Sequence, residues 1–150
     1  MRILRIYLLV TLASGFSVAG TSAQDLSALQ KGAEKIVRLH SPELRLIDSD
    51  KTEKKAVYNW GTNRKGIHLL IFYGESVHEA TEWMNKTISF LSVGPGKKLK
   101  GLGDEAYFAS SPKGDFAIYR FRKANVYMEV SAPSNGTAES IAKMLAKEIR

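Results

Sequence analysis

The chain has no cysteine, and this absence excludes several classes of structure and chemistry. Disulfide bonds, thiol nucleophiles, cysteine-ligated zinc and iron–sulfur clusters all require this residue. A lipid-modified cysteine at the start of a mature chain is excluded for the same reason. We therefore expect the fold to be stabilised by ordinary apolar burial, without a covalent cross-link.

The common catalytic and metal-binding motifs are also missing. The three histidines, His40, His68 and His78, are too widely spaced to form a short metal-binding pair. No GxSxG nucleophile motif follows residue 23. Residues 94–97, Gly-Pro-Gly-Lys, lack the first glycine and the final hydroxyl residue of a phosphate-binding loop. We predict no catalytic residue, no metal ion and no cofactor.

The first 23 residues have the pattern of a secretory signal peptide. Arg2 and Arg5 form a cationic start, residues 6–12 an apolar run, and residues 21–23 a small-residue cleavage site. The apolar run is too short to cross a bilayer. We predict that residues 1–23 are removed, and that residues 24–150 form a single exported domain. It would be periplasmic or secreted, of bacterial origin, and without stable membrane insertion.

The charge of the chain is moderately basic, with a formal net charge of +7. Lysine and arginine are spread along the sequence, which fits plain solubility as well as contact with anionic envelope polymers or lipid head groups. Export separates the protein from most nucleic acid, so we predict no nucleic-acid partner.

Apolar residues recur with helical spacing in three segments: 25–40, 76–91, and a final segment that opens at 134–137. Ser76 and Glu79 form a capping box at the start of the second segment. Strand patterns occupy the intervals, at residues 44–47, 56–60, 67–73, 106–109, 116–121 and 126–132. The expected order is therefore helix, three strands, helix, three strands, helix.

A weak internal repeat accompanies this order, because residues 117–121 resemble residues 56–60 and the apolar positions of the following helices keep the same offset. We predict an α+β fold in which a single, mostly antiparallel sheet of about six strands carries the helices on one face. In the alternative, the first helix covers the second face and the domain is a three-layer α/β/α sandwich.

Strand alternation indicates which side chains point toward the helices. A two-residue turn at Lys123 and Ala124 would place Phe121 across from Val126, and Tyr119 across from Met128, on the helix side. The opposite face would mix aromatic, aliphatic and charged groups, which is typical of a contact surface. The candidate binding residues on that face are His68, Leu70, Phe72, Arg120, Arg122, Tyr127 and Glu129.

A glycine-rich segment at residues 101–107 has the sequence GLGDEAY. Its glycines permit unusual backbone angles, and Asp104 can accept hydrogen bonds from a turn. The segment resembles a motif of small exported bacterial proteins, which include uncharacterised lipoproteins and extracytoplasmic sensor domains. Residues 125–130 resemble the strand that follows the motif in those proteins. The resemblance implies an envelope domain and no particular reaction.

Two interpretations of this segment remain open. It is either a turn that leads into the following strand, or a loop that binds a ligand through Gly101, Gly103 and Asp104. For the whole chain, we predict a non-catalytic binding or protein-interaction module. Its partner would be an unknown envelope protein or an anionic, partly apolar ligand. The alternative is a periplasmic enzyme of hydrolase type with unidentified catalytic residues.

Overall fold

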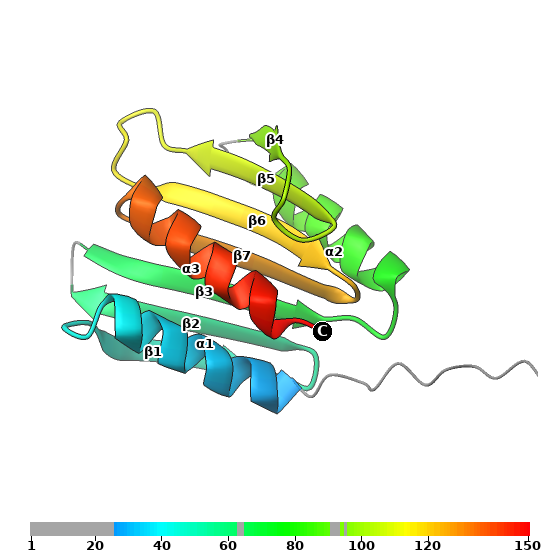
Figure 1. Ribbon diagram of the computed structural model, residues 1–150, viewed down its shortest axis with the longest axis horizontal. Helices are drawn as coiled ribbons and strands as arrows, with labels where there is room; N and C mark the ends of the chain where they lie inside the picture. The colour runs from blue at the N-terminus through cyan, green and yellow to red at the C-terminus, as the bar shows by residue number, and fades with distance from the viewer. Residues whose placement is uncertain (1–25, 63–64, 91–93, 95) are drawn as a thin grey trace, which may run out of the picture.

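The computed structural model describes residues 26–62, 65–90, 94 and 96–150, so the predicted signal peptide lies outside the described residues (Figure 1). No helix in these ranges has the length and apolar character needed to cross a membrane. The elements, in chain order, are α1 (Leu26–His40), β1 (Arg45–Lys51), β2 (Lys55–Thr62), β3 (Lys65–Tyr73), α2 (Val77–Phe90), β4 (Lys97–Leu99), β5 (Glu105–Ser110), β6 (Ala117–Lys123), β7 (Val126–Ala132) and α3 (Asn135–Glu148).

The strands form one antiparallel sheet in the order β1-β2-β3-β7-β6-β5-β4. This confirms the α+β class and the antiparallel sheet. The sheet has seven strands, one more than the sequence suggested. The additional strand, β4, has only three residues and two of them are lysines, so it shows no alternation. It is a strand only because it pairs with β5 at the sheet edge.

Helices cover both faces of the sheet, and the prediction that all of them pack on one face is wrong. In Figure 1, α1 and α3 lie side by side in front of the sheet and α2 lies behind it. The three-layer alternative is correct in outline, but the helix on the second face is α2 and not α1. Its buried side chain Met84 packs with Phe72 and Tyr127 of the sheet, a cluster separate from the main core.

The main core lies between the sheet and the pair α1 and α3, and its composition confirms the predicted strand parity. Tyr58, Trp60, Tyr119 and Met128 are all buried there. The register of the last hairpin differs from the prediction by two residues, because Phe121 pairs with Met128 and Tyr119 with Val130. The turn residues are 124 and 125, and Ala124 has a φ of +50°. A shift of two residues leaves every side chain on its predicted face.

The predicted repeat holds for the strands and fails for the helices. The β1-β2-β3 and β5-β6-β7 meanders meet through β3 and β7 at the centre of the sheet. The helix that follows each meander goes to a different face, since α2 packs in the second cluster and α3 in the main core. Val77, at the offset position of the buried Ala138, is 52% exposed.

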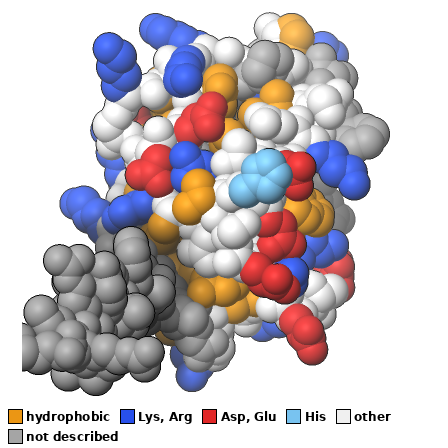
Figure 2. All heavy atoms as spheres, turned by 90° about the vertical axis from the view of Figure 1, so that its right-hand side faces the viewer, with side chains coloured by type: hydrophobic (Ala, Val, Ile, Leu, Met, Phe, Trp, Pro, Cys, Tyr) orange, Lys and Arg blue, Asp and Glu red, His pale blue; other side chains and the backbone are white. Residues whose placement is uncertain are grey.

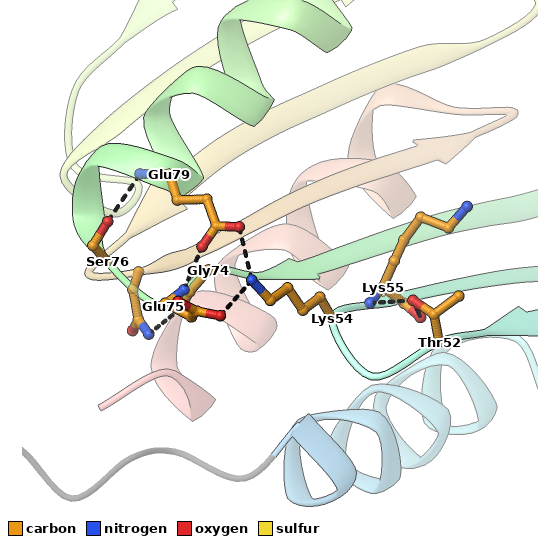
Figure 3. A network of polar contacts seen from close by, with 8 residues as sticks. Thr52, Lys54, Lys55, Gly74, Glu75, Ser76 and Glu79 are labelled. Carbon is orange, nitrogen blue, oxygen red and sulfur yellow. Dashed lines mark hydrogen bonds and ion pairs between the residues drawn. The ribbon is translucent and has the colours of Figure 1, made fainter.

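The start of α2 follows the predicted capping signal and fixes the helix to the sheet (Figure 3). The Glu79 amide donates to Ser76 Oγ over 3.1 Å, and the Glu79 carboxylate accepts from the Glu75 amide over 2.7 Å. Lys54 binds both Glu75 and Glu79, at 2.7 and 3.0 Å. The Glu75 amide and the Lys54 ammonium lower the pKa of Glu79 below its ordinary value. These contacts hold α2 against the end of β3.

Candidate functional site

Helix α2 buries most of the face that the sequence predicted to be a contact surface. Phe72, Arg120, Tyr127 and Glu129 are buried, and Arg120 has no exposed area at all. This corrects the expectation of an uncovered face, because these four side chains cannot meet a partner while α2 is in place. The reason is that the second face carries its own apolar cluster, which attracts the amphipathic α2.

Arg120 forms a buried ion pair beneath α2. Its Nε donates to Glu129 Oε2 over 2.9 Å, and its Nη1 donates to the carbonyl oxygen of Gly94 over 3.0 Å. Arg120 and Glu129 face each other directly across β6 and β7. The Tyr127 hydroxyl donates to the same carboxylate oxygen over 3.4 Å, and burial raises the pKa of Tyr127, with a further contribution from Glu129. The arginine charge is thus neutralised inside the protein.

Arg122 is also engaged, in this case with the GLGDEAY segment. Its Nη1 donates to Asp104 Oδ2 and to the Ala124 carbonyl oxygen, both over 3.0 Å. The same carboxylate oxygen accepts from the Ala124 amide over 2.7 Å, and the Asp104 amide donates to the Arg122 carbonyl over 2.8 Å. Asp104 therefore clamps the loop to the turn between β6 and β7. Neither arginine is left to attract an anionic ligand on this face.

The backbone of the same loop requires its second glycine. Gly103 has a φ of +64°, and a Cβ there would lie 2.5 Å from the Arg122 carbonyl oxygen. Leu102, between the two glycines, is buried in the main core. These observations support the interpretation of the segment as a turn that leads into β5. Its role as a ligand loop stays a prediction.

Part of the second face remains open where α2 does not reach. Helix α2 packs against β3, β7 and β6, whereas α1 lies on the opposite face (Figure 1). On the second face, therefore, no helix of the described ranges packs over β1 and β2. We define the open strip as the half-buried side chains at this border: Val57, Asn59, His68, Leu70 and Ser131. Of these, Leu70 also packs against the apolar cluster beneath α2. Asp48 and Asp50 of β1 border it and are exposed. Of the predicted face, only His68, Leu70 and Arg122 keep accessible surface beyond a few per cent.

His68 is the titratable residue of the open strip. Its Nδ1 lies 2.8 Å from Asn59 Oδ1, and a carbonyl oxygen can only accept, so Nδ1 carries the proton. Burial lowers the pKa of His68 below 6.5, and the Glu129 carboxylate partly opposes this shift. The imidazole is therefore neutral at pH 7, with Nε2 as an acceptor. Ser131 faces His68 across β3 and β7.

Metal ligation has no support in residues 26–62, 65–90, 94 and 96–150, which contain no cluster of three or more histidine, aspartate or glutamate side chains suited to an ion. Two hollows on the described part of the surface carry charged side chains that could bind a ligand. One, of about 420 Å³, lies between the GLGDEAY segment and the last turns of α3. We call it the lysine pocket, and its lining is Gly101, Leu102, Gly103, Asp104, Lys123, Lys143, Ala146 and Lys147. The other, of about 430 Å³, lies along the outer face of α1 at Lys31, Glu34, Lys35, Arg38 and Leu39.

The lysine pocket brings the predicted loop residues Gly101, Gly103 and Asp104 together with lysines that the sequence analysis did not select. Lys143 and Lys147 are four residues apart and so share one side of a helix. The four-residue spacing of these two lysines was the only sign of the pocket that the sequence offered. It could not show that a loop some forty residues earlier lies against the same turns.

Comparison with known proteins identifies a fold relative and no family. No protein-family model matches the chain, and no curated protein does. A crystal structure from Thermotoga maritima, described as a GTP binding regulator, has a similar fold. The match has a TM-score of 0.51 and 18% sequence identity, and it covers 77% of this chain and 85% of the other. At that identity the similarity concerns the fold alone.

Proposed function

We propose that this protein is an exported, non-catalytic binding module that contacts an envelope protein through the open strip. The observation that carries the proposal is that α2, the helix of the described ranges that lies on the second face, packs against β3, β7 and β6 and makes no comparable contact with β1 or β2. Val57 and Leu70 supply apolar contact there, while His68, Asn59 and Ser131 supply hydrogen-bonding groups. An uncovered sheet area with this mixture is typical of a protein contact.

The charges around the open strip favour a protein partner over an anionic ligand. The arginines that suggested an anion are bound to Glu129 and Asp104. The charged side chains nearest the strip on β1 are the carboxylates of Asp48 and Asp50, of which Asp50 pairs with Lys55. A partner with hydrogen-bond donors or positive charge at its rim would complement them.

Export is the part of the proposal that depends on residues 1–23, and it has its own test. When the full chain is expressed in a bacterium, the protein recovered from the periplasm or medium should begin at Gln24. A chain that stays in the cytoplasm with its first residues intact would contradict export, and with it the envelope partner.

A charge placed in the open strip tests the binding surface. The variant Leu70→Arg should abolish recovery of cross-linked envelope partners, because a guanidinium would replace an apolar contact. Val77→Arg is the matched control, since it adds the same charge at an exposed apolar residue of α2 outside the strip. Both variants should first be shown to keep the circular dichroism spectrum of the parent.

The comparison of these two variants shows whether partners bind at the open strip. Partners kept by Val77→Arg and lost by Leu70→Arg would support the open strip as the site. Equal recovery with both variants would show that binding, if any, occurs elsewhere on the molecule.

A hydrolase is the second candidate, and one observation favours it. Asn59 orients the neutral His68, and Ser131 is the cross-strand partner of that histidine. These are the residue types of an orienting group, a base and a nucleophile. In the described part of the chain no hydrogen bond joins Ser131 to His68. Labelling by a fluorophosphonate probe that is lost in Ser131→Ala would support an enzyme, and no labelling would contradict it.

A further inference from the structure

The lysine pocket lies on the α3 side of the sheet, away from the open strip on the α2 side. Lys123 reaches it from the end of β6, and Lys143 and Lys147 reach it from α3. Figure 2 shows lysine and arginine side chains at several places around the outline of the molecule. We propose that this pocket binds a phosphate group, as a phosphate monoester or as the phosphate of a lipid head group.

The charges of the lining favour an anion. Asp104 is the only carboxylate that lines the pocket, and Arg122 and the Ala124 amide already bind it. Lys143 pairs with Glu139 over 2.6 Å. Lys147 has no ion-pair partner among the side chains that the structure describes. Three lysines therefore line the pocket, of which Lys143 has a carboxylate partner, and the Asp104 carboxylate is already bound by Arg122, so the lining carries an excess of positive charge.

The loop that forms the other wall is fixed before any ligand arrives. Leu102 is buried, the Asp104 amide is held by the Arg122 carbonyl, and Gly103 lies against the same carbonyl. A fixed wall lowers the entropic cost of binding. The hollow of about 420 Å³ is large enough for a phosphate and the first atoms of its ester group.

Contact with the carbonyl groups at the end of α3 accounts for only one of the lysines. Lys123 Nζ donates to the Ala146 carbonyl oxygen over 2.9 Å, which satisfies a free carbonyl at the end of α3. Lys143 and Lys147 make no such contact with the helix end in the described structure, and they are exposed. Removing them should therefore leave the fold intact while weakening the phosphate site.

The experiment follows amide signals of the mature protein by NMR during titration with inorganic phosphate and with glycerol 3-phosphate. The expected result is saturable shifts confined to residues 101–104 and to the amides near Lys123, Lys143 and Lys147. The double variant Lys143→Gln/Lys147→Gln should weaken the affinity at least about tenfold, because two charged contacts are lost. The control Lys31→Gln/Lys35→Gln removes the same charge from the hollow on α1 and should leave the affinity unchanged.

Vesicles distinguish the two sources of phosphate. The pocket binds a lipid head group if the protein sediments with phosphatidylglycerol vesicles but not with phosphatidylcholine vesicles, and if the double variant Lys143→Gln/Lys147→Gln no longer sediments with the former. Saturation by glycerol 3-phosphate without vesicle binding would assign it to a soluble ester. Shifts spread over all surface lysines, or equal affinity in both double variants, would overturn the proposal. Leu70→Arg should not affect phosphate binding, so failure of the open strip leaves this site untouched.

Discussion

At the scale of single residues, the charged side chains of the second face are structural. Arg120 and Glu129 lie under α2 and neutralise each other, while Arg122 and Asp104 join a loop to a turn. A buried charge is tolerated only with a partner, which applies to Arg120 and Glu129, whereas Asp104 of the second pair is exposed. Their loss should affect stability before it affects binding.

The buried Arg120–Glu129 pair predicts that a single variant loses stability and that a double variant regains most of it. Glu129→Leu should lower the free energy of unfolding by about 3–5 kcal/mol, because it leaves the Arg120 guanidinium buried without a counter-charge. Arg120→Met/Glu129→Leu removes both charges and should recover most of this loss. Urea unfolding measures both effects. A double variant as unstable as the single variant would show that the pair itself contributes the stability.

The two glycines of the GLGDEAY segment should respond differently to alanine. Gly101→Ala should cost about 1–2 kcal/mol, since its φ of +80° is unfavourable for alanine while a Cβ there would meet no atom within 4 Å. Gly103→Ala should cost clearly more, because the added Cβ would also collide with the Arg122 carbonyl. Thermal unfolding of the two variants compares them. Equal losses would contradict the role given to the close backbone contact.

His68 should make the stability of the protein depend on pH. Burial lowers the pKa of this imidazole in the folded state, so the unfolded chain binds more protons below 6.5. The free energy of unfolding should therefore decrease as the pH falls from 6.5 toward the folded pKa. Urea unfolding at several pH values should show this slope, and His68→Gln should reduce it. His78→Gln, at an exposed histidine in the first turn of α2, should keep the slope.

At the scale of elements, the first turn of α2 controls how the second face is covered. Ser76 caps the helix, and Lys54 ties Glu75 and Glu79 to the sheet (Figure 3). Ser76 and Glu79 were visible in the sequence as a capping box, whereas the parts taken by Glu75 and Lys54 were not. The face on which the helix packs was not visible, because the apolar Phe72 and Tyr127 allow an amphipathic helix to pack on the second face as well.

The cap yields a prediction on stability and exposure. Ser76→Ala should reduce the free energy of unfolding by about 0.5–2 kcal/mol, since the Glu79 amide loses its acceptor. Hydrogen exchange should accelerate in α2 more than in α3. Ser89→Ala removes a hydroxyl from the other end of the same helix, where it donates to the Lys86 carbonyl oxygen, and should change neither quantity measurably. Uniform acceleration across all three helices would contradict local control by the cap.

At the scale of the whole molecule, the strand pattern was predictable and the three-dimensional partners were not. Alternation fixed the side of Tyr58, Tyr119 and Met128, and a two-residue error in the last hairpin did not disturb it. Pairing of β4, the side taken by α2, and the meeting of the GLGDEAY segment with Lys143 all depend on contacts between distant segments. Such contacts leave little local trace in a sequence.

The ends of the sheet lead to a prediction about self-association. Strand β1 lies at one edge of the sheet and could pair with β1 of a second copy. An antiparallel pairing centred on Asp48 would place Asp48 opposite Asp48 and Arg45 opposite Lys51, and these like charges would repel each other. Asp48→Val/Asp50→Val should therefore promote dimers or larger aggregates, which light scattering after gel filtration would detect. Ser49→Val keeps both carboxylates and should remain at the parent mass. Association of that control would show that charge is not what protects the edge.

The contact between α1 and α3 has a consequence for the timing of folding. His40 at the end of α1 accepts or donates a hydrogen bond with Ser140 of α3, one hundred residues later, and both helices seal the same core. A chain that emerges from its N-terminus onward cannot close that layer until its last helix is free. This layer can therefore form only after α3 has been synthesised, and truncation before residue 135 should leave a chain that proteases digest rapidly.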